Sequence, residues 1–361
     1  MKKVLFLSNH FITLYSFRKE LLIELSKGEY DIYISTPKDS QNSFFTDLGF
    51  NVIETNIDRR GINPLNDITL IKQYYSIMKK IKPDIIFSFT VKPNIYGSFV
   101  SNILNIRQIC NITGTGGTFL NNDILARLVR FLYKISVKKS YKVFFQNTGD
   151  LEYFKKYKMI ANNYDVLPGS GVNLERYQIT SFPNDRCISF IFIGRVMKLK
   201  GIDEYLEAAK IIKQKYKNVN FYIAGWNEEQ EYIDKVHDYE NKGYVKYLGF
   251  QNNIYEWIKK CQCVILPSHG GEGIPNVLLE AAATGRICIA SRINGSKDVI
   301  DETITGFLFE KNDYYDLASK IEMVLSMNNV QKEIMALNAR RKIEQKFDRK
   351  IVVNKYLEEL Q

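Results

Sequence analysis

The sequence predicts an α/β fold in which parallel sheets are covered by helices on both faces. Short apolar segments with strand character alternate with helical patterns along the chain. The alternation stops once, in a turn-rich segment after residue 163, and then restarts. The length of 361 residues suits two domains of roughly 150 residues, each with its own hydrophobic core. We therefore expect two facing Rossmann-like domains with a cleft between them.

The first half of the chain has the alternation expected for a parallel sheet. Its expected strands are apolar segments bounded by turn residues, at 4–8, 31–35, 51–54, 84–89, 107–112 and 142–146. Its expected helices are longer segments with apolar residues at helical spacing, at 15–25, 43–48, 64–81, 94–104 and 123–138. Such alternation favours strand–helix–strand units and therefore a parallel sheet.

The second half repeats this organisation after a break. Residues 164–173 contain a proline and two glycines that mark turns, and a polar stretch follows around residues 181–185. The expected strands then cover 187–193, 220–224, 245–248, 263–267, 286–290 and 306–309. The expected helices cover 202–216, 228–240, 254–261, 276–283, 295–300, 314–326, 331–345 and 350–360. The restart indicates a second domain, and we place the boundary after residue 170.

Positive charge is concentrated in the first half, which contributes +9 to the net charge of +10. Its densest stretch, Arg127–Lys142, has six basic residues and no acidic one, interleaved with apolar and aromatic residues. A basic amphipathic helix of this kind suits an anionic membrane surface. The alternative is a helix with one face in the core and a solvated basic face. We do not expect a nucleic-acid partner, because no recognised nucleic-acid motif accompanies the charge.

The remaining composition favours a cytoplasmic protein at the inner face of the cell membrane. No apolar run reaches the roughly 18 residues needed to span a bilayer, and residues 1–8 resemble a first buried strand more than a signal peptide. The five cysteines are scattered and odd in number, as expected for free thiols in a reducing compartment. Cys261 and Cys263 have no second pair of ligands, so we predict no metal site there.

The first candidate ligand loop is Gly194–Ile202, which follows an expected strand and opens a helix. Ligands in open parallel sheets bind outside the carboxyl ends of strands. A helix N-terminus attracts anions, the Arg195 guanidinium can grip two phosphate oxygens, and Lys200 adds a point charge. The alternative is a loop of solvated basic residues.

The second candidate loop is Pro267–Glu280, which follows the strand expected at 263–267. Its glycines permit close approach of a ligand to the backbone, and Pro275 suits the first turn of a helix. Glu272 and Glu280 are eight residues apart and flank the start of that helix. Carboxylates accept hydrogen bonds from paired hydroxyls, which suits a sugar at one end and a ribose at the other. The alternative, a capped helix with a surface glutamate, does not explain the Gly-Gly-Glu-Gly-x-Pro context.

Together these motifs resemble those of the retaining glycosyltransferases of family four, which have the GT-B fold. That family carries Gly-Arg-x₄-Lys-Gly and Pro-Ser-x₃-Glu-Gly-x-Pro-x₄-Glu, or close variants, as found here at 194–201 and 267–280. The resemblance covers nearly the whole chain. It implies an acceptor and membrane-facing domain at 1–170, a nucleotide-sugar donor domain at 171–345, and a last helix at 346–361 that crosses back to the first domain.

The resemblance also implies roles for individual residues. Arg195, Lys200 and Glu272 would be catalytic, the two cations holding the donor diphosphate and the glutamate contacting the donor sugar. The implied donor-binding residues are Gly194, Phe250, Gly273, Ile274, Pro275, Asn276 and Glu280. Among these, Glu280 would bind the ribose, and Phe250 would either contact the nucleobase or pack in the core.

The acceptor site has a weaker signature. Residues 90–97 and 111–117 resemble loops of enzymes that assemble capsule, O-antigen and lipid-linked oligosaccharides. Lys92 either pairs with an acceptor phosphate or is a surface lysine, and the glycine-rich turn at 114–117 either admits a ligand or is only a tight turn. Many family members have a glycine pair after the first strand, where this chain has His10. The implied acceptor-binding residues are His10, Lys92, Asn94, Thr115 and Gly116.

The implied reaction is retaining transfer of a hexose or N-acetylhexosamine from a nucleotide-diphosphate sugar, with UDP expected on family frequency. The acceptor would be an undecaprenyl-diphosphate-linked saccharide in bacterial surface polysaccharide assembly. A leaving phosphate oxygen would take the acceptor proton, which agrees with a chain of only three histidines. No Asp-x-Asp pair occupies a suitable position, so we expect no metal and no cofactor other than the nucleotide sugar as co-substrate.

Three alternatives remain. A nucleotide-sugar 2-epimerase shares the architecture but needs acid–base groups beside the sugar. A nicotinamide-dependent oxidoreductase would need Gly-x-Gly-x-x-Gly after the first strand, which is missing. A non-enzymatic basic membrane-binding protein would leave Glu272 and Glu280 unexplained.

Overall fold

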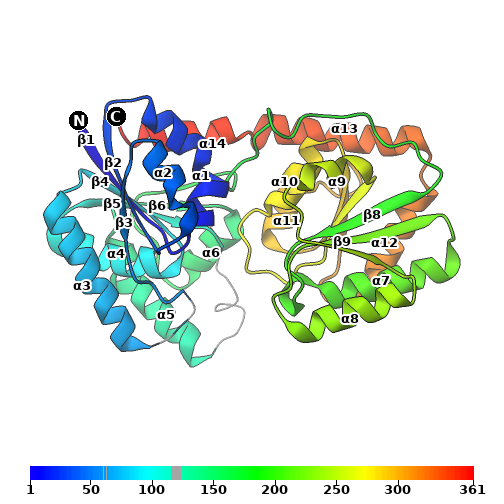
Figure 1. Cartoon of the computed structure of the whole chain (residues 1–361), viewed down its shortest axis with the longest axis horizontal. Helices are drawn as coiled ribbons and strands as arrows, with labels where there is room; N and C mark the ends of the chain where they lie inside the picture. Colours follow the sequence, from blue (N-terminus) through cyan, green and yellow to red (C-terminus); the bar gives the residue numbers. More distant parts are fainter. Residues whose placement is uncertain (60, 62, 115–122) are drawn as a thin grey trace. The chain divides into compact units, whose positions relative to one another are not determined.

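The computed structural model of the chain describes residues 1–59, 61, 63–114 and 123–361. The chain divides into two compact units, the first formed by Met1–Ser170 with Lys350–Gln361 and the second by Gly171–Arg349. Each unit contains one parallel sheet with helices on both faces (Figure 1). The predicted α/β class with two parallel sheets is confirmed.

The first unit has a seven-stranded sheet in the order β3-β2-β1-β4-β5-β6-β7. Its strands are β1 (Lys2–Leu7), β2 (Tyr30–Thr36), β3 (Asn51–Glu54), β4 (Ile85–Phe89), β5 (Arg107–Ile112), β6 (Lys142–Phe145) and β7 (Tyr164–Val166). Its helices are α1 (Phe11–Ser26), η1 (Ser40–Asn42), α2 (Ser43–Asp47), α3 (Pro64–Ile81), α4 (Val91–Leu104), α5 (Ile124–Ile135), η3 (Val137–Lys139), α6 (Thr148–Lys156) and α14 (Arg349–Glu358).

The C-terminal helix α14 completes the core of the first unit. Val352, Tyr356 and Leu360 are buried among side chains of β1 and β4. Arg18 Nε donates a hydrogen bond of 3.1 Å to the Tyr356 hydroxyl, which itself donates to Asn111 on β5. The end of the chain therefore stabilises a sheet formed by its beginning.

An α-helix and a strand of the first unit, α6 and β7, were not predicted, nor was the short 3-10 helix η1. We expected residues 164–166 to belong to the turn-rich break, and this expectation is wrong, because they form an edge strand that pairs with β6. The strand has only three residues, and Tyr164 is exposed, so it lacks the continuous apolar run typical of a buried parallel strand. Helix α6 begins after Asn147, whose side chain accepts a hydrogen bond from the Asp150 amide.

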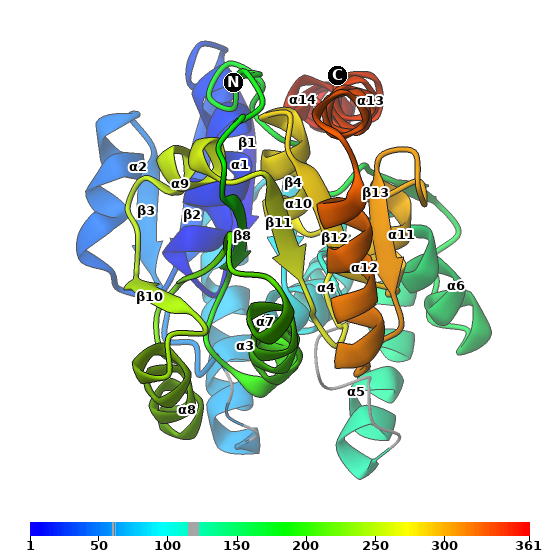
Figure 2. The ribbon, with the colours of Figure 1, turned by 90° about the vertical axis from the view of Figure 1, so that its right-hand side faces the viewer.

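The second unit has a six-stranded sheet in the order β10-β9-β8-β11-β12-β13 (Figure 2). Its strands are β8 (Ile188–Ile193), β9 (Val219–Ala224), β10 (Lys246–Gly249), β11 (Cys263–Leu266), β12 (Ile287–Ser291) and β13 (Gly306–Phe309). Its helices are η4 (Lys198–Lys200), α7 (Ile202–Lys215), α8 (Gln230–Asn241), α9 (Ile254–Lys260), α10 (Asn276–Ala283), α11 (Asn294–Val299), α12 (Tyr314–Ser326) and α13 (Asn329–Lys346).

Apolar side chains cover both faces of this second sheet. Helices α7, α8 and α12 pack on one face, and α9, α10 and α13 pack on the other. All six strands are parallel, so the loops after β8, β9, β10, β11 and β12 leave the same edge of the sheet. Both candidate ligand loops lie at this carboxyl edge, as expected for an open parallel sheet.

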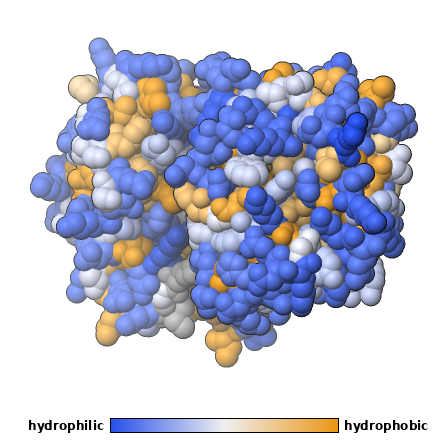
Figure 3. Space-filling view, turned by 45° about the vertical axis from the view of Figure 1, so that its right-hand side comes forward, coloured by the Kyte–Doolittle hydropathy of each residue, from blue (hydrophilic) through white to orange (hydrophobic). Residues whose placement is uncertain are grey.

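Helix α5 exposes apolar side chains on its outer face. Ala126 and Tyr133 are buried, whereas a stripe of side chains at helical spacing is exposed, formed by Ile124, Leu128, Phe131 and Ile135. In Figure 3, hydrophobic atoms reach the surface at the lower edge of the molecule, the side on which α5 lies in Figure 1. The structure therefore agrees with the alternative of one face in the core and exposed basic residues, and it adds an exposed apolar stripe that a solvated basic face does not explain. None of the described helices combines the length and hydrophobicity that crossing a bilayer requires.

Candidate active site

The loop after β8 packs directly against the loop after β11. Gly201 ends η4 with φ +73°, a left-handed conformation that favours glycine. A Cβ at this position would collide with the carbonyl oxygen of Pro267. Since β8 and β11 are neighbours in the sheet, the two candidate loops form one surface.

Polar contacts connect these two loops. The His269 amide donates to the Leu199 carbonyl at 2.9 Å, and the His269 Nε2 lies 3.0 Å from Glu204 Oε2 on α7. Lys200 Nζ forms an ion pair with Glu272 Oε1 at 2.8 Å. The structure thus brings together Lys200 and Glu272, two of the three residues predicted to be catalytic.

The Glu272 carboxylate is held in its charged form. Burial by itself would raise its pKa, but attraction to Lys200 and hydrogen bonds from Lys200 and Ser268 outweigh burial and leave the pKa below its usual value. Ser268 Oγ donates to Glu272, while Ser291 Oγ donates to the Ser268 carbonyl. The carboxylate is therefore charged and fixed in orientation before any ligand binds.

The third predicted catalytic residue, Arg195, lies on the same edge with its side chain one-third exposed (33%). Its Nη1 lies 3.4 Å from Oε1 of Glu228, a residue in the loop between β9 and α8. Sequence reasoning did not identify Glu228. A wider search of the loops after all parallel strands would have included it, because β9 is the neighbour of β8.

The remaining residues of the second loop surround the start of α10. Pro275 immediately precedes α10, and Gly273 and Ile274 are buried before it. A Cβ at Gly295, in the first turn of α11, would collide with the Gly273 carbonyl oxygen. Asn276 Oδ1 is buried and has no hydrogen-bond partner within the described part of the chain. This close packing fixes the backbone around Gly273 and Ile274, two of the residues predicted to bind the donor.

Glu280 lies on α10 beside a tyrosine and two arginines. Its carboxylate lies beside the buried Tyr177, with Arg176 and Arg349 nearby. Burial raises the pKa of Glu280 to about 7, and the tyrosine and the arginines oppose this shift. A carboxyl group whose pKa is raised in this way, close to the carboxyl edge of the sheet, is typical of functional sites.

This pKa predicts a pH dependence of stability. Between the usual value of 4.5 and about 7, the folded chain retains a proton that the unfolded chain has released. The contribution of Glu280 to the free energy of unfolding therefore falls as pH rises from about 5 to 7. The test is urea unfolding at pH 5, 6 and 7. The free energy of unfolding of the wild type minus that of Glu280→Gln should decrease as the pH rises across this range, because glutamine does not titrate. A difference that does not change with pH would contradict the assignment.

Phe250 lies in the loop after β10 and is exposed (57%), so the alternative of core packing is wrong. The predicted residue Gly194 immediately follows β8, and its amide donates to the Ala224 carbonyl at 3.0 Å. Both residues therefore lie at the same edge as Arg195.

The predicted acceptor residues of the first unit have internal partners. His10 caps α1 by accepting a hydrogen bond of 3.1 Å at Nδ1 from the Ile12 amide, and burial followed by repulsion from Arg59 lowers its pKa. Lys92 pairs with Asp67 at 2.7 Å and is largely buried, so it is not a solvated surface lysine. Asn94 is buried, and its amide bridges β4 and β5. Thr115 and Gly116 lie outside the described residues.

A polar pocket of about 420 Å³ opens at the carboxyl ends of β2 and β3. Hydroxyl, amide and charged groups contribute to its lining, which consists of Pro37, Lys38, Thr55, Asn56, Ile57, Asp58, Asn66 and Thr69. None of these residues was predicted. Most of them follow β2 or β3, whereas Asn66 and Thr69 lie in the first turns of α3, and together they form no sequence motif.

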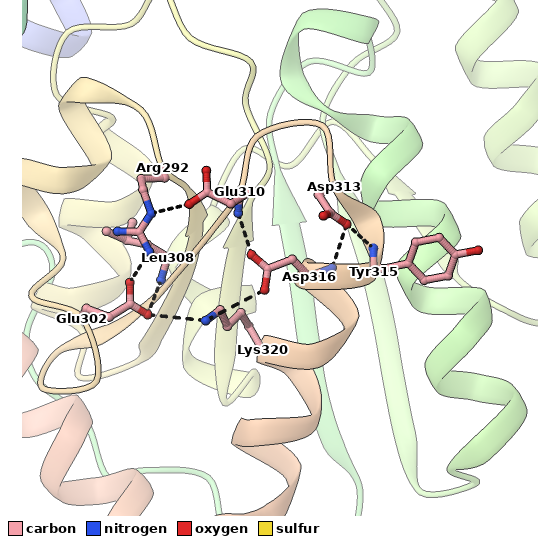
Figure 4. Close-up of polar contacts among 8 residues, drawn as sticks. All are labelled: Arg292, Glu302, Leu308, Glu310, Asp313, Tyr315, Asp316 and Lys320. Atoms are coloured by element: carbon pink, nitrogen blue, oxygen red, sulfur yellow. Dashed lines mark hydrogen bonds and ion pairs between the residues drawn. The ribbon is translucent and has the colours of Figure 1, made fainter.

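A network of ion pairs occupies the edge of the second sheet next to β13 (Figure 4). Arg292 contacts Glu302 at 2.9 Å and Glu310 at 2.8 Å, and Lys320 lies 3.9 Å from both Glu302 and Asp316. Asp313 caps α12. Since these charges are paired with one another, we interpret the network as structural and separate from the ligand loops.

The two halves of the chain match two family models. "Glycosyl transferases group 1" matches residues 178–342, and "Glycosyl transferase 4-like" matches residues 3–147. Together they include both candidate ligand loops and most of the first unit.

Individual proteins are similar over most of their length. The chain is 26% identical to the N,N'-diacetylbacillosaminyl-diphospho-undecaprenol alpha-1,3-N-acetylgalactosaminyltransferase of Campylobacter jejuni, over 98% of this chain and 96% of the relative. It is 27% identical to the UDP-Gal:alpha-D-GlcNAc-diphosphoundecaprenol alpha-1,3-galactosyltransferase of Escherichia coli, over 79% and 76%. The crystal structure of Anabaena HepE in complex with UDP has a TM-score of 0.80 at 18% identity, covering 100% of this chain and 99% of HepE.

These matches confirm the family predicted from the motifs, and the GT-B fold is shared with solved glycosyltransferases. The chain belongs to the group 1, family 4-like glycosyltransferases.

Proposed function

We propose that this glycosyltransferase moves a hexose or N-acetylhexosamine from a UDP-sugar to a lipid-linked saccharide, with retention of configuration. The observation that carries the proposal is the convergence of Arg195, Lys200 and Glu272 at one edge of the second sheet. The Campylobacter and Escherichia relatives, by name, act on saccharides linked to undecaprenyl diphosphate, and the Escherichia enzyme uses UDP-Gal. HepE was crystallised with UDP. These relatives support the choice of donor and acceptor.

In the proposed mechanism, the donor diphosphate binds Arg195 and Lys200, and Glu280 accepts hydrogen bonds from the ribose. Glu272 contacts the donor sugar. The bond between the anomeric carbon and the phosphate oxygen breaks, and the acceptor oxygen bonds to the same face of that carbon. The leaving phosphate oxygen takes the proton of the acceptor hydroxyl. Fixed cations at the site of the developing charge supply the main stabilisation of the transition state.

Both cations are already paired with carboxylates in the absence of the diphosphate. Arg195 lies 3.4 Å from Glu228, and Lys200 lies 2.8 Å from Glu272. When the donor binds, phosphate oxygens would replace the Glu228 carboxylate at Arg195 and the Glu272 carboxylate at Lys200. Each cation would therefore keep a negatively charged partner. We propose that this exchange orients Glu272 toward the sugar, and that the two cations serve in place of a divalent metal.

A thermal-shift screen tests the donor site. UDP, GDP, ADP and their sugar conjugates are added to the purified chain with EDTA and, separately, with Mg²⁺. A ligand that binds only the folded state raises Tm by mass action. We expect UDP to raise Tm in EDTA and Glu280→Ala to lose this shift, with Glu333→Ala, an exposed glutamate on α13, as the control. If no nucleotide raises Tm, the donor-site assignment fails.

A second assay separates transfer from epimerisation. The chain is incubated with the stabilising UDP-sugar, with and without a synthetic undecaprenyl-diphosphate-linked N-acetylhexosamine. A transferase extends the acceptor and leaves the sugar of the unreacted donor unchanged, whereas a 2-epimerase converts the donor without any acceptor. A binding protein without catalytic activity would alter neither compound.

We further propose that the chain meets its acceptor at an anionic membrane surface through α5 and η3. The exposed apolar stripe of α5 lies beside basic residues, and a groove of about 770 Å³ lined by Lys134, Lys138 and Lys139 adjoins it. None of these lysines has an acidic partner among the residues that the structure describes. Apolar groups next to unneutralised lysines suit the boundary between lipid headgroups and acyl chains.

This surface predicts a loss of vesicle binding on charge reversal. Lys134→Glu/Lys138→Glu should lower binding to vesicles containing phosphatidylglycerol by roughly tenfold or more at low salt, because each lysine near such a surface contributes about 1 kcal/mol. Lys217→Glu/Lys311→Glu, which reverses two exposed lysines of the second unit, is the control with equal net charge. Equal losses in both variants in a flotation assay would assign the effect to net charge and contradict the surface.

A further inference from the structure

Two exposed aromatic side chains contact each other at the carboxyl edge of the second sheet. Trp226 follows β9 and is 44% exposed, and Phe250 follows β10 and is 57% exposed. Their ring centroids are 5.5 Å apart, with an angle of 49° between the planes. Single exposed aromatic residues are ordinary, but an aromatic pair at a ligand edge forms an apolar surface that a ligand can cover.

The backbone holds Trp226 between two loops of the proposed donor site. The Val196 amide donates to the Trp226 carbonyl at 3.0 Å, next to Arg195. The Gly225 amide donates to the Gly249 carbonyl at 2.9 Å, next to Phe250. A Cβ at Gly225 would collide with the Gly194 carbonyl oxygen, so the segments after β8 and β9 are packed too closely for a larger residue at this position. The backbone position of Trp226 is therefore determined by the sheet.

A short polar chain connects the indole to a proposed phosphate-binding cation. Trp226 Nε1 donates to Glu228 Oε2 at 3.3 Å, and Glu228 Oε1 lies 3.4 Å from Arg195 Nη1. The Glu228 carboxylate thus joins the aromatic pair to the cation, with one oxygen toward the indole N–H and the other toward the guanidinium. A nucleoside diphosphate has a planar base at one end and an anionic diphosphate at the other. The aromatic pair suits the base, and the neighbouring cation suits the diphosphate.

We propose that Trp226, together with Phe250, forms the stacking platform for the nucleobase of the donor. This inference rests on the proposed function, because it names the position of the base of the same donor. Stacking on aromatic side chains tolerates every base, since each base has a π-face. Trp226 therefore contributes affinity and orientation, and discrimination between uracil and the purines must come from groups at the edge of the base.

The two tryptophans of the chain allow a direct test. Trp257 is half-buried, donates from Nε1 to Gln251 Oε1 at 3.0 Å and packs against Tyr222. Trp257→Phe leaves Trp226 as the sole tryptophan. In this variant, UDP should quench the fluorescence in a saturable manner, with the Kd that calorimetry gives for the wild type. Inorganic diphosphate, which has no base, should bind with little quenching. In the converse variant, Trp226→Phe, UDP should leave the fluorescence nearly unchanged.

Affinity provides an independent readout. Trp226→Ala should weaken UDP binding roughly tenfold, the loss typical of removing one stacking side chain. Its affinity for inorganic diphosphate should stay within about twofold of wild type, and Trp226→Phe should retain most of the UDP affinity because it keeps an aromatic face.

The possible failures are distinguishable. If UDP binds but Trp226→Ala binds it as tightly as wild type, or if diphosphate quenches as strongly as UDP, the platform is overturned and the proposed function stands. An exposed pair that meets another protein instead of a base would give this result. If UDP does not bind, ADP and GDP replace it in the same titrations. If none of the three binds, the donor assignment and the platform both fail.

Discussion

Arg195→Ala should lower kcat for sugar transfer by about two to three orders of magnitude, the usual cost of removing one preorganised group that stabilises charge in a transition state. The variant should fold normally, because the Arg195 side chain is one-third exposed (33%). Its partner Glu228 is also partly exposed (17%), so water can solvate that carboxylate after the substitution. Arg195→Lys should recover only part of the rate, since an ammonium cannot contact two phosphate oxygens in the planar geometry of a guanidinium.

The control for this prediction is Lys198→Ala, which removes a positive charge from the same loop. Lys198 is exposed, and within the described residues its contact with a carboxylate, that of Glu229, is made by its backbone amide. Its kcat should stay within about twofold of wild type, as expected for a solvated surface charge. Turnover should be measured with saturating donor and a fixed acceptor, with Tm recorded for each variant. Near-normal kcat in Arg195→Ala would remove Arg195 from the catalytic residues.

Arg286→Leu should lower the free energy of unfolding by roughly 3–5 kcal/mol, the largest effect on stability that we expect. Arg286 is 1% exposed, and no carboxylate is recorded near it in the described part of the chain. Its guanidinium instead donates to backbone carbonyl oxygens of six residues, Thr180, Ser181, Ile258, Lys259, Thr284 and Gly285, and to the Thr180 hydroxyl. Burial lowers the pKa of this arginine to about 10, so it remains charged at neutral pH.

The cost arises because leucine removes the donors and leaves several buried carbonyl groups without hydrogen bonds. Arg286→Lys should also be strongly destabilising, because one ammonium cannot reach all these acceptors. Arg341→Leu, at an exposed position on α13, is the matched control and should change stability by less than about 0.5 kcal/mol. Urea unfolding measures each difference. A loss below about 1 kcal/mol in Arg286→Leu would show that water replaces the guanidinium.

The sequence predicted the fold because its information is local and repeated. The alternation of apolar segments and helical patterns can be recognised from residues close together in the sequence, and both units of the structure contain it. The errors occurred where that signal is weak. The edge strand β7 has three residues, none of them fully buried, and α6 was not recognised between β6 and β7.

Loop motifs were informative for a related reason. In a parallel sheet the carboxyl ends of all strands meet at one edge, so residues after β8 and after β11 were expected to be close before their strand order was known. The Lys200–Glu272 contact of 2.8 Å agrees with this expectation. The assignment of Arg195, Lys200, Glu272 and Glu280 to a donor site remains a prediction.

The sequence alone determined the α/β class, the family and the loops that carry the candidate chemistry, because each depends on patterns within a short stretch of chain. Only the tertiary structure decided which side chains meet. Strand order made Glu228 the partner of Arg195 and placed Trp226 beside Phe250, residues from loops that are 24 or more positions apart. Packing buried Asn94 and exposed the apolar stripe of α5. Periodicity shows which face of an element is apolar, but the neighbouring elements determine whether that face is covered.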